Sequence, residues 1–171
     1  IENGVLVKYR GKGGDVTVPA GVTSIDYGAF NECNNVSSIT LPDGLRSIRA
    51  FAFSNCGSLT SVTIPAGVTS IGFNAFEGCN RLERVFVGDG TKSIGECAFK
   101  SCSALTDVRL PASVTEIGWD AFYDIPAGAT ITVRGKKPWH WPEGWQKSLK
   151  KHGGWKKGGP ARPRTGTASP R

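Results

Sequence analysis

Five cysteines are the residues of this 171-residue chain with the clearest capacity for chemistry. Four of them recur at a constant interval of 23 residues, at Cys33, Cys56, Cys79 and Cys102. A zinc site needs four ligands that converge on one point at about 2.3 Å, and a disulfide needs Cβ atoms about 3.8 Å apart. Residues placed once per repeat of a stacked fold form a row instead, so we interpret these four as small buried hydrophobic side chains. Cys97 lies outside the interval and is the one candidate reactive thiol.

Other catalytic residues are scarce. The only two histidines, His140 and His152, both lie in a tryptophan-rich segment towards the C-terminus. The sequence contains no nucleophile elbow, metal-ligand helix or phosphate-cradling loop, since the glycine run at 11–14 lies between expected strands and not before a helix. We therefore predict that the protein is not an enzyme and that it has no metal, no cofactor and no small-molecule substrate.

The cysteines belong to a 23-residue unit that organises the chain. Its first full copy, VTSIDYGAFNECNNVSSITLPDG, occupies residues 22–44. Every copy has isoleucine at its fourth position and Ala-Phe at its eighth and ninth positions. Further full copies begin at Leu45, Val68 and Thr91, without insertion or deletion, and a shortened copy begins at Val114. A fixed period of this length predicts a solenoid, because one unit cannot bury its own apolar face and copies must stack.

Each unit contains the elements of one coil. The segment LTSVTI, from Leu59 to Ile64, has the LxxVxI pattern of a strand whose eighteenth and twentieth positions face inward. Pro42, Pro65 and Pro111 follow such strands and end them, because proline cannot donate to a strand ladder. The V-T-S-I segment predicts a second short extended piece, and A-F-x-x-C predicts a short helical or 3-10 turn with its Phe and Cys in the core.

The run VTSIG-x-x-AF-x-x-C-x-x-L-x-x-V-x-IP resembles the BspA-like leucine-rich repeat, over about residues 15–133. The resemblance implies a mainly β repeat solenoid, a curved right-handed stack of short parallel strands. It also implies a secreted or cell-surface protein of the kind found in bacteria and protists, which binds protein partners on a host or neighbouring cell. The third copy has Gly88-Asp89-Gly90 where Pro-x-Gly is expected, so we expect a looser turn there.

These patterns divide the chain into four parts. Residues 1–21 predict an N-terminal β-hairpin cap, with strands at 4–9 and 15–18, and residues 22–133 form the repeat solenoid. Residues 134–152 form a basic Trp-rich segment and a possible C-terminal cap, and residues 153–171 predict a disordered basic tail. We expect a monomer without a transmembrane segment. The chain begins with Ile1, which indicates a fragment or a processed form.

Charge is distributed unevenly along the chain. The net charge is +7, but residues 1–133 hold 10 Lys/Arg against 13 Asp/Glu, a net charge of −3. Residues 134–171 hold 11 Lys/Arg against one Glu, a net charge of +10. The solenoid is therefore mildly acidic, and the basic character belongs to the C-terminal part.

The candidate partner-binding surface is the solvent face of the long strands. It comprises the seventeenth and nineteenth positions of the four full copies: Ser38, Thr40, Ser61, Thr63, Arg84, Phe86, Asp107 and Arg109. Arginine and aromatic residues are typical of interface hot spots, which favours the second half of this face. The sixth position holds Tyr27, Phe73 and Trp119 in alternate copies. These could form a sugar or protein platform, but we favour the interpretation that they cover the edges of the core.

The Trp-rich segment gives an alternative function. Its basic and aromatic residues could bind an anionic polymer, such as a wall polysaccharide, a membrane surface or nucleic acid. They are Lys136, Lys137, Trp139, Trp141, Trp145, Lys147, Lys150 and Lys151. Two other interpretations stay open, a cap over the last coil and a tail with no role of its own. The favoured prediction is a non-catalytic recognition or adhesion module, with a structural spacer in a longer surface protein as a further alternative.

Overall fold

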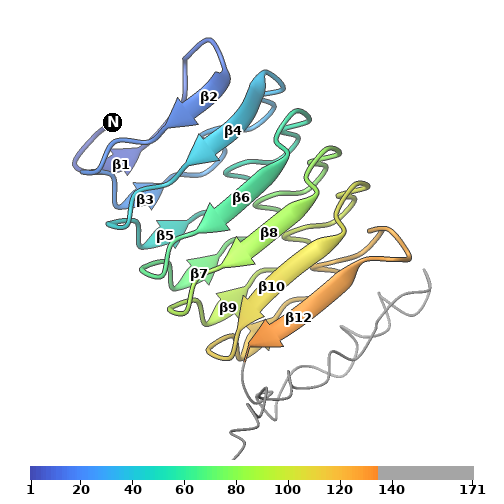
Figure 1. Cartoon of the computed structure of the whole chain (residues 1–171). Helices are drawn as coiled ribbons and strands as arrows, with labels where there is room; N and C mark the ends of the chain where they lie inside the picture. The colour runs from blue at the N-terminus through green and yellow to red at the C-terminus, as the bar shows by residue number, and fades with distance from the viewer. Residues whose placement is uncertain (135–171) are drawn as a thin grey trace, which may run out of the picture.

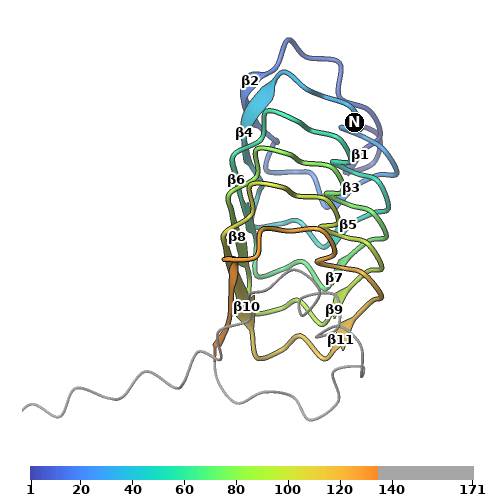
Figure 2. The same ribbon diagram turned by 90° about the vertical axis from the view of Figure 1, so that its right-hand side faces the viewer.

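The computed structural model describes residues 1–134, which form a solenoid of stacked coils (Figure 1). Each regular coil contributes one long and one short strand, on opposite sides of the stack (Figure 2). The short strands are β1 (Val5–Leu6), β3 (Ser24–Ile25), β5 (Ser47–Ile48), β7 (Ser70–Ile71), β9 (Ser93–Ile94) and β11 (Glu116–Ile117). The long strands are β2 (Gly14–Thr17), β4 (Val36–Thr40), β6 (Ser61–Ile64), β8 (Arg84–Val87), β10 (Asp107–Pro111) and β12 (Thr130–Arg134). The predicted mainly β solenoid of parallel strands is confirmed.

Each strand pairs in parallel with its counterpart in the next coil, except that β4 does not pair with β6. The short strands form one sheet in the order β1-β3-β5-β7-β9-β11, and equivalent residues of successive copies lie opposite one another. The long strands form two sheets, β2-β4 and β6-β8-β10-β12. Since β6, β8, β10 and β12 also pair in register, each position of the repeat becomes a straight row along the stack.

The segments with the A-F-x-x-C pattern are chains of turns, so the predicted helical or 3-10 turns are wrong; residues 1–134 contain no helix. Two residues per coil have a left-handed backbone, for example Phe51 (φ 56°) and Asn55 (φ 56°) in the third coil. A right-handed helix cannot continue through such residues. The N–H groups here alternate between two kinds of partner: Ala52 donates to Arg49 within the coil, and Phe53 donates to Ala75 of the next coil at 2.7 Å.

The core is a column of side chains between the two strand layers. The Ala-Phe positions are fully buried in the second to fifth coils. Their phenylalanine rings stack on one another, with centroid distances that rise from 4.9 Å for Phe30–Phe53 to 5.3 Å for Phe99–Phe122. Tyr9 continues this column at its N-terminal end, 4.8 Å from Phe30, and its hydroxyl accepts a hydrogen bond from the Gly13 N–H at 3.1 Å.

The N-terminal segment is a shortened coil and not the predicted hairpin. β1 pairs with β3 and β2 pairs with β4, both in parallel, so the two strands belong to different sheets. The stretch between the inward residues Leu6 and Val16 is four residues shorter than the stretch between their partners Ile25 and Ile39. An alternating strand–turn–strand pattern fits a hairpin equally well, because it does not specify with which strand each segment pairs.

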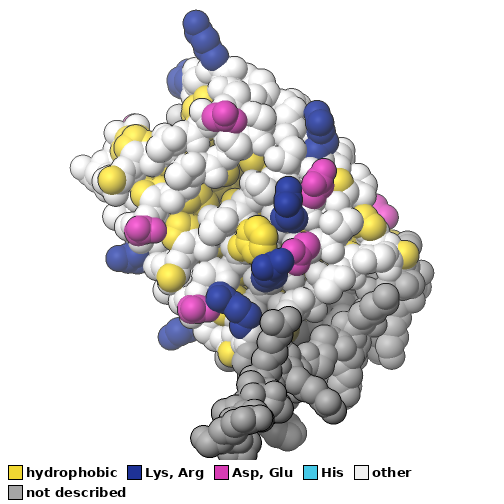
Figure 3. All heavy atoms as spheres, in the orientation of Figure 1, with side chains coloured by type: hydrophobic (Ala, Val, Ile, Leu, Met, Phe, Trp, Pro, Cys, Tyr) yellow, Lys and Arg dark blue, Asp and Glu magenta, His cyan; other side chains and the backbone are white. Residues whose placement is uncertain are grey.

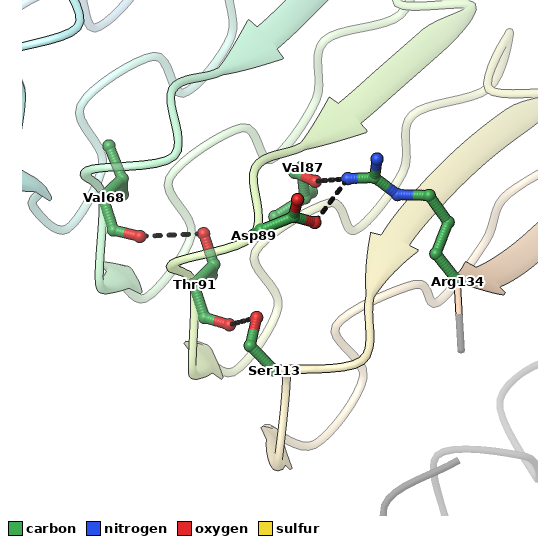
Figure 4. A network of polar contacts seen from close by, with 6 residues as sticks. All are labelled: Val68, Val87, Asp89, Thr91, Ser113 and Arg134. Carbon is green, nitrogen blue, oxygen red and sulfur yellow. Dashed lines mark hydrogen bonds and ion pairs between the residues drawn. The ribbon is translucent and has the colours of Figure 1, made fainter. Parts of the chain in front are cut away.

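The Gly88-Asp89-Gly90 turn is packed closely and is not loose. A Cβ atom on Gly90 would lie 1.9 Å from the carbonyl oxygen of Ala66 in the preceding turn. The Arg134 side chain reaches across from the end of β12 and donates to the Asp89 carboxylate at 2.7 Å and to the Val87 carbonyl (Figure 4). This ion pair anchors a turn that lacks the usual proline.

Thr91, which follows the turn, is fully buried in a position that other copies fill with Val or Leu. Its hydroxyl donates to the carbonyl of Val68 at 2.9 Å, and its own carbonyl accepts a hydrogen bond from the Ser113 hydroxyl at 2.7 Å (Figure 4). The buried hydroxyl is thus satisfied by the preceding coil, and the backbone carbonyl of Thr91 is satisfied by the following one.

Candidate functional site

The outward face of the long strands carries the residues predicted to bind a partner. Along each strand, buried hydrophobic side chains alternate with side chains that face the solvent, as in Ser61, Val62, Thr63 and Ile64 of β6. The structure brings all eight predicted residues onto this one face, in the order of their coils. Two further rows extend it beyond the prediction: Asp15 and Thr17 on β2, and Thr130 and Thr132 on β12. Their place at the seventeenth and nineteenth positions of incomplete copies was the signal that could have identified them.

The N-terminal half of this face is small and hydroxyl-rich. Ser38 donates to the Asp15 carboxylate at 2.6 Å, and Ser37 donates to the same oxygen at 3.2 Å. The hydrogen bond from Ser38, followed by that from Ser37, lowers the pKa of Asp15, which is fully exposed. The carboxylate is therefore charged at neutral pH, but its hydrogen bonds tie it to its neighbours, so it offers little to a partner.

The C-terminal half holds a compact cluster that we call the Phe86 patch, which comprises Arg84, Phe86, Asp107 and Arg109. Phe86 on β8 lies directly opposite Arg109 on β10, and Arg84 lies opposite Asp107. The Arg109 guanidinium lies over the Phe86 ring, with its carbon 4.9 Å from the ring centroid. It also forms a forked pair with Asp107, at 3.0 Å and 3.4 Å. The patch is thus built by contacts between adjacent strands.

The charges of the Phe86 patch remain available to solvent. The side chains of Arg84 and Arg109 are 57% and 56% exposed, while Asp107 is 28% exposed. Figure 3, which looks onto this face, shows basic and acidic side chains around a hydrophobic one. A half-buried ring beside fixed charges suits a complementary surface, because the forked Arg109–Asp107 pair has already lost part of its rotamer freedom.

The aromatic residues of the sixth position do not cover the core, which corrects our interpretation. Tyr27, Phe73 and Trp119 are 65%, 42% and 70% exposed. They follow the short strands, on the side of the solenoid away from the long strands (Figure 2). The rings can project outward because the short strand ends at the isoleucine of the fourth position, so the strand alternation does not extend to the sixth position.

The cysteine row has the predicted structural role in most coils. Cys56, Cys79 and Cys102 are fully buried, and each thiol donates to the carbonyl of the ninth-position phenylalanine in the preceding coil, at 3.1–3.2 Å. Burial raises the pKa of the Cys102 thiol to about 12. Cys33 and Cys97 are partly exposed, and burial raises the pKa of both thiols. Cys97 is therefore accessible but not activated as a nucleophile.

Residues 1–134 hold no group of three or more His, Cys, Asp or Glu side chains that could bind a metal ion. The same part of the chain has no helix long and apolar enough to cross a membrane. The predicted polymer-binding residues from Lys136 to Lys151, and the two predicted C-terminal parts apart from Arg134, lie outside the described residues.

Comparisons with known proteins agree with the repeat architecture. The family described as BspA type leucine rich repeat region matches residues 9–128, in six copies. The leucine rich repeat protein of T. pallidum is 31% identical, with a TM-score of 0.69 over 74% of this chain and 62% of that protein. A leucine rich cell surface protein from Faecalibacterium prausnitzii is 33% identical, with a TM-score of 0.52 over 70% of this chain and 38% of that protein.

A leucine-rich repeat protein from Bacteroides ovatus, 24% identical with a TM-score of 0.50, shares the fold over 74% of this chain and 43% of its own. The chain thus spans less than two thirds of the length of each of these three structures. No curated protein matches it in sequence.

Proposed function

The chain belongs to the BspA-type leucine-rich repeat family, and from this premise we propose that it is a non-catalytic recognition module that binds a protein partner at a cell surface. It resembles a bacterial cell-surface leucine-rich repeat protein in sequence and fold. The observation that carries the proposal is the Phe86 patch, a half-buried aromatic ring held under a guanidinium between two strands. Tyrosine, tryptophan and arginine dominate interface energetics, and a preformed patch loses little entropy on binding.

The rest of the face gives the patch a rigid setting. Phe86 lies beside Thr63 of β6 on one side and Arg109 on the other, in unbroken register. Beyond Arg109 lies Thr132, a short side chain that leaves the guanidinium accessible. We infer that the Phe86 patch forms the centre of the interface and that the hydroxyl-rich rows form its polar rim.

Binding of the full chain to a panel of immobilised extracellular matrix proteins tests this proposal. We expect Phe86→Ala and Arg84→Ala each to weaken binding by at least about 1 kcal/mol, the magnitude that marks an interface hot spot. Thr63→Ala, on the neighbouring strand of the same face, serves as the matched control and should change affinity little. Equal binding by all three variants would contradict the proposal and favour a structural spacer.

The charge of the C-terminal part supports a second candidate function, capture of an anionic polymer. Residues 134–171 hold 11 Lys/Arg against one Glu. Phosphate or sulfate neutralisation by so many cations makes binding steeply dependent on salt. If truncation after Arg134 abolishes binding to heparin or DNA while the Phe86→Ala variant retains it, the basic segment is the polymer-binding part.

A further inference from the structure

We propose that the side of the solenoid away from the Phe86 patch binds an uncharged, extended β-1,4-linked polysaccharide, through a row of aromatic rings that we call the aromatic strip. The strip consists of Tyr27, Phe51, Phe73 and Trp119. Pyranose rings with equatorial substituents present flat faces of C–H groups, which stack on exposed aromatic rings as other flat apolar groups do. The proposal concerns a second ligand and does not depend on the protein-binding role of the long strands.

The backbone holds the strip in a regular lattice. The backbone N–H of the seventh position in one coil donates to the carbonyl of the sixth position in the next coil. The Phe51 N–H donates to the Phe73 carbonyl at 2.9 Å, and the Cys97 N–H donates to the Trp119 carbonyl at 2.9 Å. The sixth positions therefore stack one per coil. Tyr27, Phe73 and Trp119 lie in alternate coils, so neighbouring rings of this row are separated by roughly 9–10 Å, twice the usual strand spacing.

This period favours a polymer over a globular partner. A spacing of two coils is comparable to the length of one disaccharide in an extended β-1,4-linked chain, in which every second ring presents the same face. The sixth-position rings of Tyr27, Phe73 and Trp119 can therefore contact such a chain at equivalent points along its length.

Phe51 completes the strip at an energetic cost. The third coil has Ala50 at its sixth position, and Phe51 at the seventh supplies the missing ring. Its centroid lies 5.3 Å from that of Tyr27 and 5.2 Å from that of Phe73. Phe51 has a left-handed backbone, with φ at 56°, which is unfavourable for a bulky side chain. Among the equivalent residues in other coils, Gly28, Asn74 and Asp120 are types that adopt this conformation more readily, and Cys97 is not. The strain is offset in the strip by the contacts of the Phe51 ring with Tyr27 and Phe73.

Polar hollows border the strip on both sides. On the side of the turns, a hollow lined by Tyr27 and Phe51 also contains the polar side chains of Asn31, Glu32 and Asn55. The ring planes of neighbouring strip residues are inclined by 55° and 72°, so a sugar can lie on one ring at a time, and these groups can hydrogen-bond to the hydroxyls at its edge.

On the side of the short strands, two more hollows lie next to the ends of the strip. One is lined by Tyr27, Ser47 and Ser70, and the other by Ser93 and Trp119. The serine hydroxyls come from the same position of successive coils, so they offer donors and acceptors once per coil, at half the interval of the sixth-position rings.

The local charges argue against an anionic polymer as the ligand of the strip. Asp26 and Arg49 beside it neutralise one another in an ion pair at 2.8 Å. Glu96 occupies the sixth position between Phe73 and Trp119, and Glu116 lines the hollow next to Trp119. A negatively charged chain would be repelled by these carboxylates, whereas the hydroxyls of an uncharged glycan can donate hydrogen bonds to them.

Titration of the full chain with cellohexaose and with chitohexaose tests the proposal. We expect saturable binding of at least one of the two oligosaccharides. Tighter binding of cellohexaose would mean that glucose units fit the hollows, and tighter binding of chitohexaose would mean that N-acetylglucosamine units fit them. Phe73→Ala and Trp119→Ala should each weaken binding by roughly tenfold, the loss expected when one stacking platform is removed. The tryptophan fluorescence change on binding should disappear in both Trp119→Ala and Trp119→Phe, but Trp119→Phe, which keeps an aromatic ring, should retain more of the affinity.

Two variants separate binding from stability. Phe51→Asn copies the residue found in the next coil, so it should keep or raise the melting temperature while weakening glycan binding. Glu96→Tyr fills the gap in the strip and should strengthen binding several-fold, a gain that no folding defect can produce. Phe86→Ala on the opposite side is the matched control and should bind both oligosaccharides like the unmodified chain.

The proposal is overturned if neither oligosaccharide binds at millimolar concentration, or if strip variants bind them as well as the unmodified chain does. If the strip variants instead abolish capture of an extracellular matrix protein while Phe86→Ala does not, the strip is a protein interface, and both this proposal and the placing of the protein site on the long strands fail. Loss of protein binding in Phe86→Ala alone, with glycan binding intact, supports two separate surfaces.

Discussion

The phenylalanine at the ninth position makes the largest packing contribution of any single residue in a coil. Phe76, in the centre of the stack, is fully buried and contacts one ring on each side, with centroids 5.0 Å from Phe53 and 5.2 Å from Phe99. The interplanar angles of 9° and 5° show that the rings are nearly parallel. Because each ring fills the space between two coils, its removal affects both interfaces.

We predict that Phe76→Ala lowers the free energy of unfolding by roughly 3–5 kcal/mol, through lost burial and a cavity that the rigid lattice cannot fill. Chemical denaturation measures this change. Phe86→Ala is the control of equal chemistry at a half-buried site and should cost less. A loss below about 1 kcal/mol for Phe76→Ala would mean that the ninth position is not part of the core.

The cysteines should differ sharply in reactivity. Cys33 and Cys97 are partly exposed, whereas Cys56, Cys79 and Cys102 are buried. We predict that a thiol reagent at pH 8 modifies the first two slowly, since burial raises the pKa of both, and reaches the other three only in denaturant. Mass spectrometry of the labelled peptides checks the assignment. Rapid labelling of Cys79 in the native protein would contradict the buried row.

The Cys102 thiol should also make stability depend on pH in the alkaline range. Its pKa is raised to about 12 in the folded protein, against about 8.5 for a free thiol. Between these values the unfolded chain releases a proton that the folded chain retains, so the contribution to stability falls as pH rises. Denaturation of the unmodified chain and of Cys102→Ala at pH 8 and pH 10.5 isolates this effect. The free energy of unfolding of Cys102→Ala, taken relative to that of the unmodified chain, should be higher at pH 10.5 than at pH 8.

At the scale of the element, the turns decide how closely the coils approach. Gly90 lies against the carbonyl of Ala66, and an added Cβ would be 1.9 Å from that oxygen. The clash is with backbone, which cannot rotate away as a side chain can. The nearby Arg134–Asp89 pair is 58% and 74% exposed, so it guides the turn but contributes little energy.

We therefore predict that Gly90→Ala destabilises the protein by about 1–3 kcal/mol, the usual cost of overpacking. Gly128→Ala is the matched control, because a Cβ on Gly128 would meet no atom within 4 Å. Asp89→Asn should cost less than about 1 kcal/mol, as expected for an exposed ion pair. Thermal unfolding of the three variants ranks these costs. If Gly90→Ala and Gly128→Ala were equally stable, the close approach of the two turns would be excluded.

The strands and their register could be predicted because they follow directly from the repeat. Once Ile25 and Ile48 occupy equivalent positions, parallel pairing of their coils has only one register that keeps both buried. The left-handed residues could not be predicted with the same ease, because Phe51 and Cys97 are not residues that mark this conformation. For the same reason, the outward direction of Tyr27 and Trp119 was missed: it depends on the turn geometry and not on hydrophobic periodicity.

The candidate site also has features that could be predicted from the repeat and features that could not. The eight residues of the long-strand face could be placed by counting positions, since strands alternate inward and outward. The contact between Arg109 and Phe86 depends on side-chain rotamers across two strands, which spacing does not specify. Arg134 was grouped with the basic segment by its charge, although its guanidinium binds Asp89 on the solenoid.

At the scale of the whole molecule, the solenoid is a one-dimensional array in which each coil is stabilised by its neighbours. The short-strand sheet and the ring column run continuously from the first coil to the last. The long-strand ladder is interrupted between β4 and β6, so β2 and β4 form a separate sheet. The β2–β4 pairing also contains a register irregularity at Gly14 and Asp15. The N-terminal coils are therefore joined to the rest by fewer hydrogen bonds than the later coils are to one another.

We predict that this seam allows the N-terminal coils to open without unfolding of the remainder. Native-state hydrogen exchange should give smaller opening free energies for amides of β2 and β4 than for those of β8 and β10. Because the array transmits stability through neighbours, Phe76→Ala should lower protection on both sides of the central coil, while Phe30→Ala should act mainly on the first coils. Equal opening free energies for β4 and β8 in the unmodified protein would show that the two sheets unfold as a single unit. The interruption would then have no energetic consequence, and the continuous ring column, with the short-strand sheet, would be sufficient to couple the whole stack.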